Sequence, residues 1–143
     1  MPTNLYGPGD NYDLNNSHVI PAMLRKFFEA KEKKLNEVVL WGTGNPKREF
    51  LHVDDLAKAI LFSIENSLSD SLYNIGSGVE VSIKELSEII QNIIGYDGSV
   101  KWDRSKPDGT PRKLMDSTKM NLAGWTANIV LKKGIESVYK SKF

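Results

Sequence analysis

A stretch late in the chain gathers cations around one carboxylate. Residues 106–113 read Lys-Pro-Asp-Gly-Thr-Pro-Arg-Lys, so Lys106, Arg112 and Lys113 surround Asp108 in a segment that two prolines stiffen. Arginine can hold a phosphate with paired donors and lysine as a point charge, while an aspartate accepts from hydroxyls or a ring amide. This combination suits a nucleoside diphosphate, and the same composition also occurs in ordinary solvated loops.

An arginine and a tryptophan are candidates for the same kind of site. Trp41 ends the apolar run 38–41, and Arg48 directly precedes the apolar run 49–53. At facing strand ends, the indole could form the wall of a pocket and the guanidinium could charge it. The alternative is a tryptophan in the core and an arginine on the surface.

The two histidines differ in their surroundings. His18 follows Ser17, which we expect to cap a helix, and its imidazole could work as an acid or a base. A second capping or packing role is the alternative. His52 alternates with Phe50 in a predicted strand, so we assign it to structure.

Several catalytic patterns are missing from the sequence. The pairs of glycines in Gly42-Thr43-Gly44 and Gly76-Ser77-Gly78 lack the third glycine of a dinucleotide loop, and no phosphate-loop pattern occurs. No HExxH, no paired-histidine spacing and no Ser/His/Asp arrangement is present, so we predict no metal site and no hydrolytic machinery.

Alternating helices and short strands must position these residues, which predicts the α/β class. Three-to-four spacing of apolar residues predicts helices over 17–34, 54–66, 83–94, 117–122 and 131–141. Short apolar runs predict strands at 38–41, 49–53, 72–75 and 100–102. We expect the first two strands to pair.

Local signals sharpen the helices. Ser82 and Glu85 form a capping box at the start of the third helix, and Asp54 is the expected cap of the second. The apolar stripe of that second helix predicts four residues facing the core: Leu56, Ala59, Ile60 and Ile64.

Composition narrows the class of protein. The 143 residues are 40% hydrophobic and 26% charged, which fits one globular domain, and there is no cysteine. A net charge of +1 is too balanced for a nucleic-acid binder. No apolar stretch approaches the ~18 residues of a membrane span. We expect a cytoplasmic protein with neither a nucleic-acid nor a membrane partner.

Four segments together resemble the GDP-L-fucose synthase family of extended short-chain dehydrogenase/reductases: residues 2–8, 16–21, 48–55 and 106–113. The resemblance runs end to end but covers only the carboxyl half of such an enzyme. It implies a small substrate-binding domain at 17–143, preceded at 1–16 by a loop on the cofactor side. The Rossmann half, with its cofactor loop and Tyr-x-x-x-Lys pair, is expected to be absent.

The family epimerises GDP-4-keto-6-deoxy-D-mannose at C3 and C5 and then reduces C4 with NADPH. By resemblance, His18 is the acid that reprotonates carbon during epimerisation. The expected NADP contacts are Pro2, Thr3, Asn4, Leu5 and His18. The expected substrate contacts are Lys26, Trp41, Arg48 and Asp108, to which the residues themselves add Arg112 and Lys113.

This resemblance predicts that the chain binds a GDP-sugar and does not oxidise NADPH by itself. It also predicts a homodimer for the full-length enzyme. Two alternatives remain open: another nucleotide-sugar epimerase or dehydratase, and a non-catalytic module that binds a nucleotide-sugar.

Overall fold

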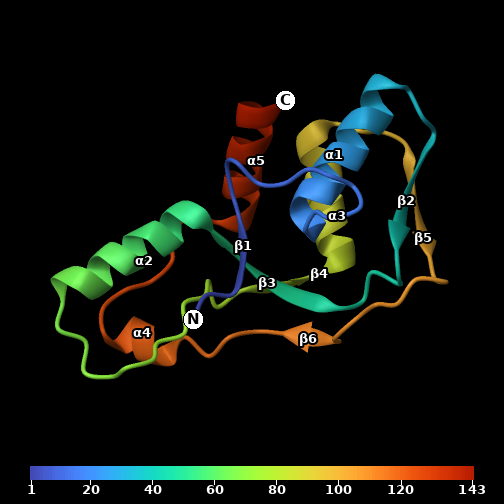
Figure 1. Ribbon diagram of the computed structural model, residues 1–143. Coiled ribbons are helices and arrows are strands. Elements are labelled where there is room, and N and C mark those ends of the chain that lie inside the picture. The colour runs from blue at the N-terminus through green and yellow to red at the C-terminus, as the bar shows by residue number, and fades with distance from the viewer.

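The computed structural model describes residues 1–143 as short strands flanked by helices, and it confirms the α/β class (Figure 1). The five helices are α1 (Val19–Glu32), α2 (Val53–Glu65), α3 (Ile83–Ile94), α4 (Thr118–Leu122) and α5 (Leu131–Lys142). The six strands are β1 (Asn4–Tyr6), β2 (Glu37–Trp41), β3 (Lys47–His52), β4 (Glu80–Ser82), β5 (Ser99–Asp103) and β6 (Arg112–Lys113). None of the helices is both long enough and apolar enough to cross a membrane.

Strand β3 is the centre of the larger sheet. It pairs in parallel with β1 and β6 and antiparallel with β4. Strand β2 pairs instead with β5, in parallel and in a separate sheet. The predicted pairing of 38–41 with 49–53 is therefore wrong. Between them, Gly42 and Gly44 both adopt positive φ in the turn that joins the two sheets.

The first sixteen residues are not wholly a loop, as the sequence suggested, because they contain β1. The backbone before β1 is also fixed: Thr3 N–H donates to the carbonyl of Ile75 at 3.0 Å, and Ile75 N–H donates to Met1 at 2.8 Å. The predicted strand at 72–75 is reduced to a single bridge between Pro2 and Ile75. Residues 1–3 and Ile75 are more than 70 positions apart, so the local pattern of apolar residues cannot predict that they pair.

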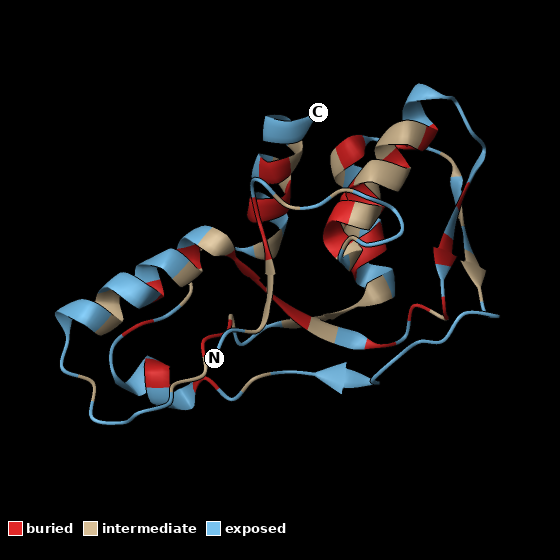
Figure 2. Ribbon diagram, viewed as in Figure 1, coloured by how far each residue is buried: buried red, intermediate tan, exposed pale blue.

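The main core lies between α1, α3, α5 and the inner face of β2 (Figure 2). Its most deeply buried side chains include Leu24, Phe27 and Ile90. A smaller cluster beneath α2 joins Leu51, Ala59, Ile75, Met120 and Trp125. Two clusters on opposite sides of β3 hold this strand in place.

Helix α3 has the predicted bounds and the predicted cap. Glu85 N–H donates to Ser82 Oγ at 3.0 Å, and Ser82 N–H donates to Glu85 Oε2 at 2.7 Å. The other two expected caps are wrong. Helix α2 is capped by His52, whose Nδ1 accepts from Asp54 N–H at 3.2 Å. Helix α1 begins after His18 without a side-chain cap, and Ser17 Oγ is buried without a partner.

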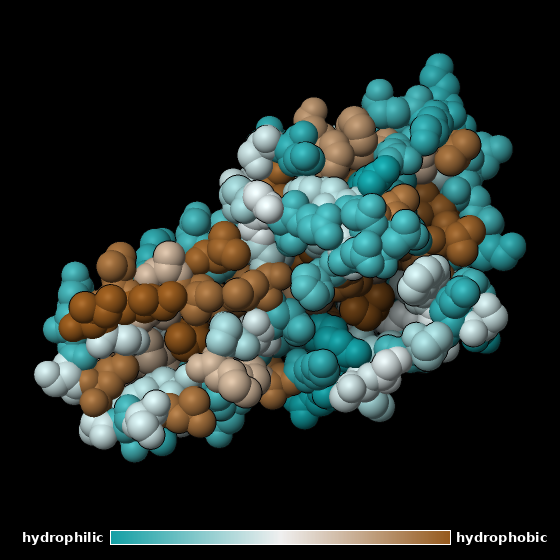
Figure 3. Space-filling view, in the orientation of Figure 1, coloured by the Kyte–Doolittle hydropathy of each residue, from teal (hydrophilic) through white to brown (hydrophobic).

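The expected buried stripe of α2 is only partly buried. Ala59 is fully buried and Leu56 is half-buried, but Ile60 is 50% exposed and Ile64 is 76% exposed. Leu61 is exposed as well, and apolar side chains gather along this helix on the molecular surface (Figure 3). The helical period correctly predicts an apolar face, but only half of it meets the core.

Candidate functional site

A cavity of about 750 Å³ lies where the first segment, the start of α1, the end of β2 and the start of β3 meet. Seven of the residues singled out in the sequence line it: Thr3, Asn4, Leu5, His18, Trp41, Arg48 and Asp108. Segments more than 100 residues apart in the sequence therefore contribute to one hollow. Its size suits a ligand of cofactor or nucleotide dimensions.

One wall of the cavity belongs to β1 and its neighbours. The Asn4 side-chain amide donates to the backbone carbonyl of Glu49 at 2.8 Å, and Thr3 Oγ1 donates to the same carbonyl at 3.4 Å. These bonds fix both side chains against β3. His18 lines the cavity at the N-cap position of α1. Leu5 lies in the same wall, so this side of the cavity carries both polar and apolar groups.

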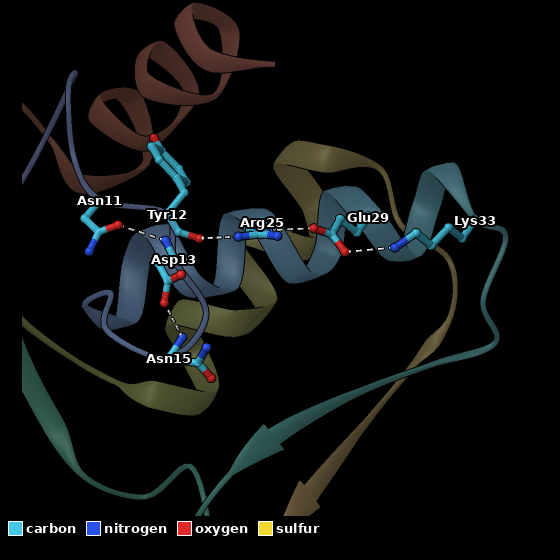
Figure 4. A network of polar contacts seen from close by, with 7 residues as sticks. All are labelled: Asn11, Tyr12, Asp13, Asn15, Arg25, Glu29 and Lys33. Carbon is cyan, nitrogen blue, oxygen red and sulfur yellow. Dashed lines mark hydrogen bonds and ion pairs between the residues drawn. The ribbon is translucent and has the colours of Figure 1, made fainter.

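The loop between β1 and α1 is tied down by a polar network (Figure 4). Arg25 Nη1 donates to the carbonyl of Tyr12 at 3.0 Å, while Arg25 Nε contacts Glu29 at 2.7 Å. Lys33 holds the other oxygen of Glu29 at 2.9 Å. Hydrogen bonds from Arg25 and Lys33 lower the pKa of Glu29, so the network keeps its charge. It holds the chain that leads to His18.

Trp41 also lines the cavity, and this residue is 61% exposed. Lys26 Nζ lies 5.7 Å from the ring centroid and Lys106 Nζ lies 5.6 Å from it. Both distances are within cation–π range. Lys26 also donates to the carbonyl of Val39 at 3.0 Å, and burial lowers the pKa of its amine. Lys26 therefore contacts Trp41, which lines the cavity, but does not line the cavity itself.

Arg48 and Asp108 both line the cavity. Both oxygens of Asp108 accept from Thr43: Oδ1 from the backbone N–H and Oδ2 from the hydroxyl, each at 2.6 Å. These bonds, and the nearby Arg48 guanidinium, lower the pKa of Asp108. A Cβ built on Gly109 would lie 3.7 Å from Arg48 Nη2, so the arginine reaches this turn.

Four of the predicted residues lie outside the cavity: Lys26, as described above, and Arg112, Lys113 and Pro2. Arg112 pairs with Glu80 at 2.7 Å, and Glu80 also contacts Lys47 at 3.6 Å, so this arginine joins β6 to β4. Lys113 is exposed and pairs in register with Arg48 across the two strands. Pro2 lies in the bridge to Ile75.

Two residues that position the site were missed in the sequence. Glu49 is fully buried, and its carboxylate accepts from Gly78 N–H at 2.7 Å and from Met115 N–H at 3.0 Å. Thr43 holds Asp108 as described above. The sequence gave only a weak signal for each: Glu49 is an acidic residue in a predicted strand, and Thr43 is a threonine between two glycines.

Comparison with known proteins places this architecture. Residues 1–76 match the model of the NAD dependent epimerase/dehydratase family. "Probable GDP-L-fucose synthase 1" of Oryza sativa subsp. japonica is 55% identical over 140 residues, which are 98% of this chain and 43% of that protein. GDP-L-fucose synthase of Escherichia coli K12 is 48% identical, over 98% of this chain and 46% of that protein.

A solved structure gives the same result. The crystal structure of a GDP-L-fucose synthetase from Naegleria fowleri superposes with a TM-score of 0.90 at 27% identity, over 97% of this chain and 43% of that chain. The same protein has also been solved bound to NADP, and that structure superposes with a TM-score of 0.89. The chain spans less than half the length of these relatives.

The short parallel strands, their flanking helices and the cavity at β1 and β3 are those of an extended short-chain dehydrogenase/reductase. The chain belongs to the NAD dependent epimerase/dehydratase family.

Proposed function

We propose that this chain is the GDP-sugar-binding part of a GDP-L-fucose synthase. The complete enzyme would epimerise GDP-4-keto-6-deoxy-D-mannose at C3 and C5 and reduce C4 to give GDP-L-fucose. The observation that carries the proposal is the single cavity of about 750 Å³ that brings His18, Trp41, Arg48 and Asp108 together from four separate segments. The identity of 48–55% to proteins of that name over 98% of the chain supports it.

The charged side of the cavity would hold the nucleotide. Arg48 offers paired donors for the diphosphate, and Lys26 and Lys106 add positive charge beside Trp41. The exposed indole is a surface on which a base or sugar can stack. Asp108, ionised through its lowered pKa, would accept from the guanine ring. Lys113, in register with Arg48, adds charge nearby.

His18 would carry out the carbon chemistry. C3 and C5 both flank the C4 ketone, so removing a proton from either gives an enolate. Inversion requires a new proton on the opposite face of the sugar, and an imidazole is a suitable donor near neutral pH. The position of His18 at the cavity wall, between the nucleotide side and β1, fits this role.

The β1 side would hold NADP. Thr3 and Asn4 are fixed against Glu49, and Leu5 lies in the same wall, so these residues and His18 would bind the nicotinamide edge. Pro2, just before them, would direct the chain into this wall. When bound, NADPH supplies the hydride that reduces C4.

A nucleotide panel tests the proposal. In a thermal-shift assay, GDP or a GDP-sugar at about 100 times its Kd should raise the Tm by roughly 5–10 °C. UDP- and dTDP-sugars at equal concentration should raise it much less. A stronger shift with UDP or dTDP would indicate another nucleotide-sugar epimerase or dehydratase, and no shift with any of them would contradict the proposal.

The whole enzyme would be a cytoplasmic homodimer, by family resemblance. The chain would not reduce the ketone unaided, because none of its tyrosines is followed four residues later by a lysine. NADPH oxidation should therefore be undetectable when this chain is mixed with substrate. Turnover above the level of a His18→Ala control would contradict this part of the proposal and would also exclude a purely binding module.

A further inference from the structure

The loop that carries Asp108, residues 104–111, is fixed at its two ends and at one point between them. At its start, Ser105 N–H donates to Asp103 Oδ1 at 3.0 Å, and at its end the carbonyl of Pro111 accepts from Lys47 at 2.9 Å. Between Lys106 and Pro111, the two bonds from Thr43 to Asp108 are the only hydrogen bonds to the rest of the chain. The middle of the loop therefore depends on Thr43.

The turn that carries Thr43 is built for close approach. Gly42 adopts φ +81°, and a Cβ at this position would collide with Asp108 Oδ1. Thr43 Oγ1 accepts from Asn45 N–H at 3.2 Å, which directs the hydroxyl proton toward Asp108 Oδ2. Thr43 thus donates to both oxygens of one carboxylate.

The Asp108 carboxylate can accept further hydrogen bonds besides those from Thr43. Each oxygen of an ionised aspartate has two lone pairs, and Thr43 occupies one on each oxygen. Asp108 and Pro107 both line the cavity, whereas Thr43 does not. The free lone pairs of Asp108 therefore remain available to a ligand, in an orientation that Thr43 sets.

We propose that Thr43 is a positioning residue of this site, which acts on the ligand through Asp108. It holds the 104–111 loop at the edge of the cavity and orients the Asp108 carboxylate toward the base of a bound guanosine nucleotide. The inference rests on the proposed function for the identity of the ligand. The contact between Thr43 and the loop stands independently of that function.

Two variants separate the effect of the Thr43 hydroxyl from the effect of the side chain's shape. Thr43→Val keeps the volume and the backbone N–H but removes the hydroxyl, and Thr43→Ser keeps the hydroxyl. Trypsin can cut after the exposed Arg104, at the start of the loop. We expect Thr43→Val to raise the rate of this cut several-fold, measured by mass spectrometry, with Thr43→Ser close to wild type. An unchanged rate in Thr43→Val would show that Thr43 does not hold the loop.

Nucleotide binding tests the second half of the inference. We expect Thr43→Val to weaken GDP binding about five- to tenfold and UDP binding much less, so that the preference for GDP falls. Thr43→Ser should restore that preference. Equal losses for both nucleotides, or tighter GDP binding, would overturn the positioning role. If the wild-type chain does not bind GDP, the proposed function fails, and the trypsin result alone decides whether Thr43 holds the loop.

Discussion

The buried carboxylate of Glu49 accepts a hydrogen bond from the backbone N–H of Gly78 at 2.7 Å. Its second oxygen accepts from Met115, and its backbone carbonyl accepts from Asn4. One residue of β3 therefore joins three distant segments. Its carboxylate leaves no room for a side chain at position 76, which is a glycine. Through Asn4, this junction also fixes one wall of the cavity.

Replacing Glu49 by glutamine should destabilise the chain. The amide presents one oxygen and one NH₂ group to two backbone donors, so one partly buried N–H loses its acceptor, at a cost of about 1–3 kcal/mol. Urea denaturation measures the effect. Glu88→Gln, on the exposed face of α3, is the matched control and should change the unfolding free energy little. Equal effects of the two variants would contradict the role of Glu49.

A methyl group at Gly42 should loosen the 104–111 loop. Gly42→Ala suffers both from its positive φ and from a collision with Asp108. Gly9→Ala is the matched control, because Gly9 also has positive φ (+82°) but an added Cβ would meet nothing within 4 Å. Tryptic cutting after Arg104 should rise in the first variant and stay at the wild-type rate in the second.

The contact between Thr43 and Asp108 should depend on pH in one direction. Hydrogen bonds from Thr43 lower the pKa of Asp108 below the ordinary aspartate value of about 3.9. Because the folded-state pKa lies below the unfolded value, the contact stabilises the loop above the unfolded value and is lost as pH falls through the folded pKa.

An NMR titration of the residue 43 amide measures this dependence. Its midpoint should lie below about 3.9 in the wild type and move up toward that value in Thr43→Val. Thr43→Ser should keep the low midpoint. A midpoint that is the same in all three proteins would show that the hydroxyl does not act on Asp108.

The exposed side of α2 should tolerate substitution that the core does not. Ile64→Ser should change the unfolding free energy by no more than about 0.5 kcal/mol, because the side chain is 76% exposed and the two residues have similar helix propensities. Leu86→Ala, at a fully buried position of α3, should cost about 2–5 kcal/mol. A large loss for Ile64→Ser would mean that this face packs against something in solution.

The helices could be predicted from the sequence because their signals are local. The capping box at Ser82 and the spacing of apolar residues give α3 with its observed bounds. Strands β1, β4 and β6 were missed because each is only two or three residues long and is defined by its partner β3. The burial of Ile60 and Ile64 was overestimated for a related reason, since a helical period shows an apolar face but not what covers it.

The site residues also divide into those with a local sequence signal and those defined by distant partners. Trp41, Arg48 and Asp108 could be predicted from their residue types and from the glycines and prolines that mark turns beside them. Glu49 and Thr43 were missed because their partners lie 66 and 65 residues further along the chain. Arg112 was grouped with the site by sequence proximity, but strand β6 directs it to Glu80 instead.

Calorimetric titration with GDP tests the central claim, that the cavity binds a guanosine diphosphate through Arg48. The wild-type chain should bind one GDP, and Arg48→Ala should weaken binding at least tenfold, because a guanidinium–phosphate contact is lost. Arg104→Ala, an exposed arginine at the start of the same loop, should bind as the wild type does. A folded wild-type chain that shows no binding at millimolar GDP, or an Arg48→Ala variant that binds as tightly as the wild type, would contradict the account.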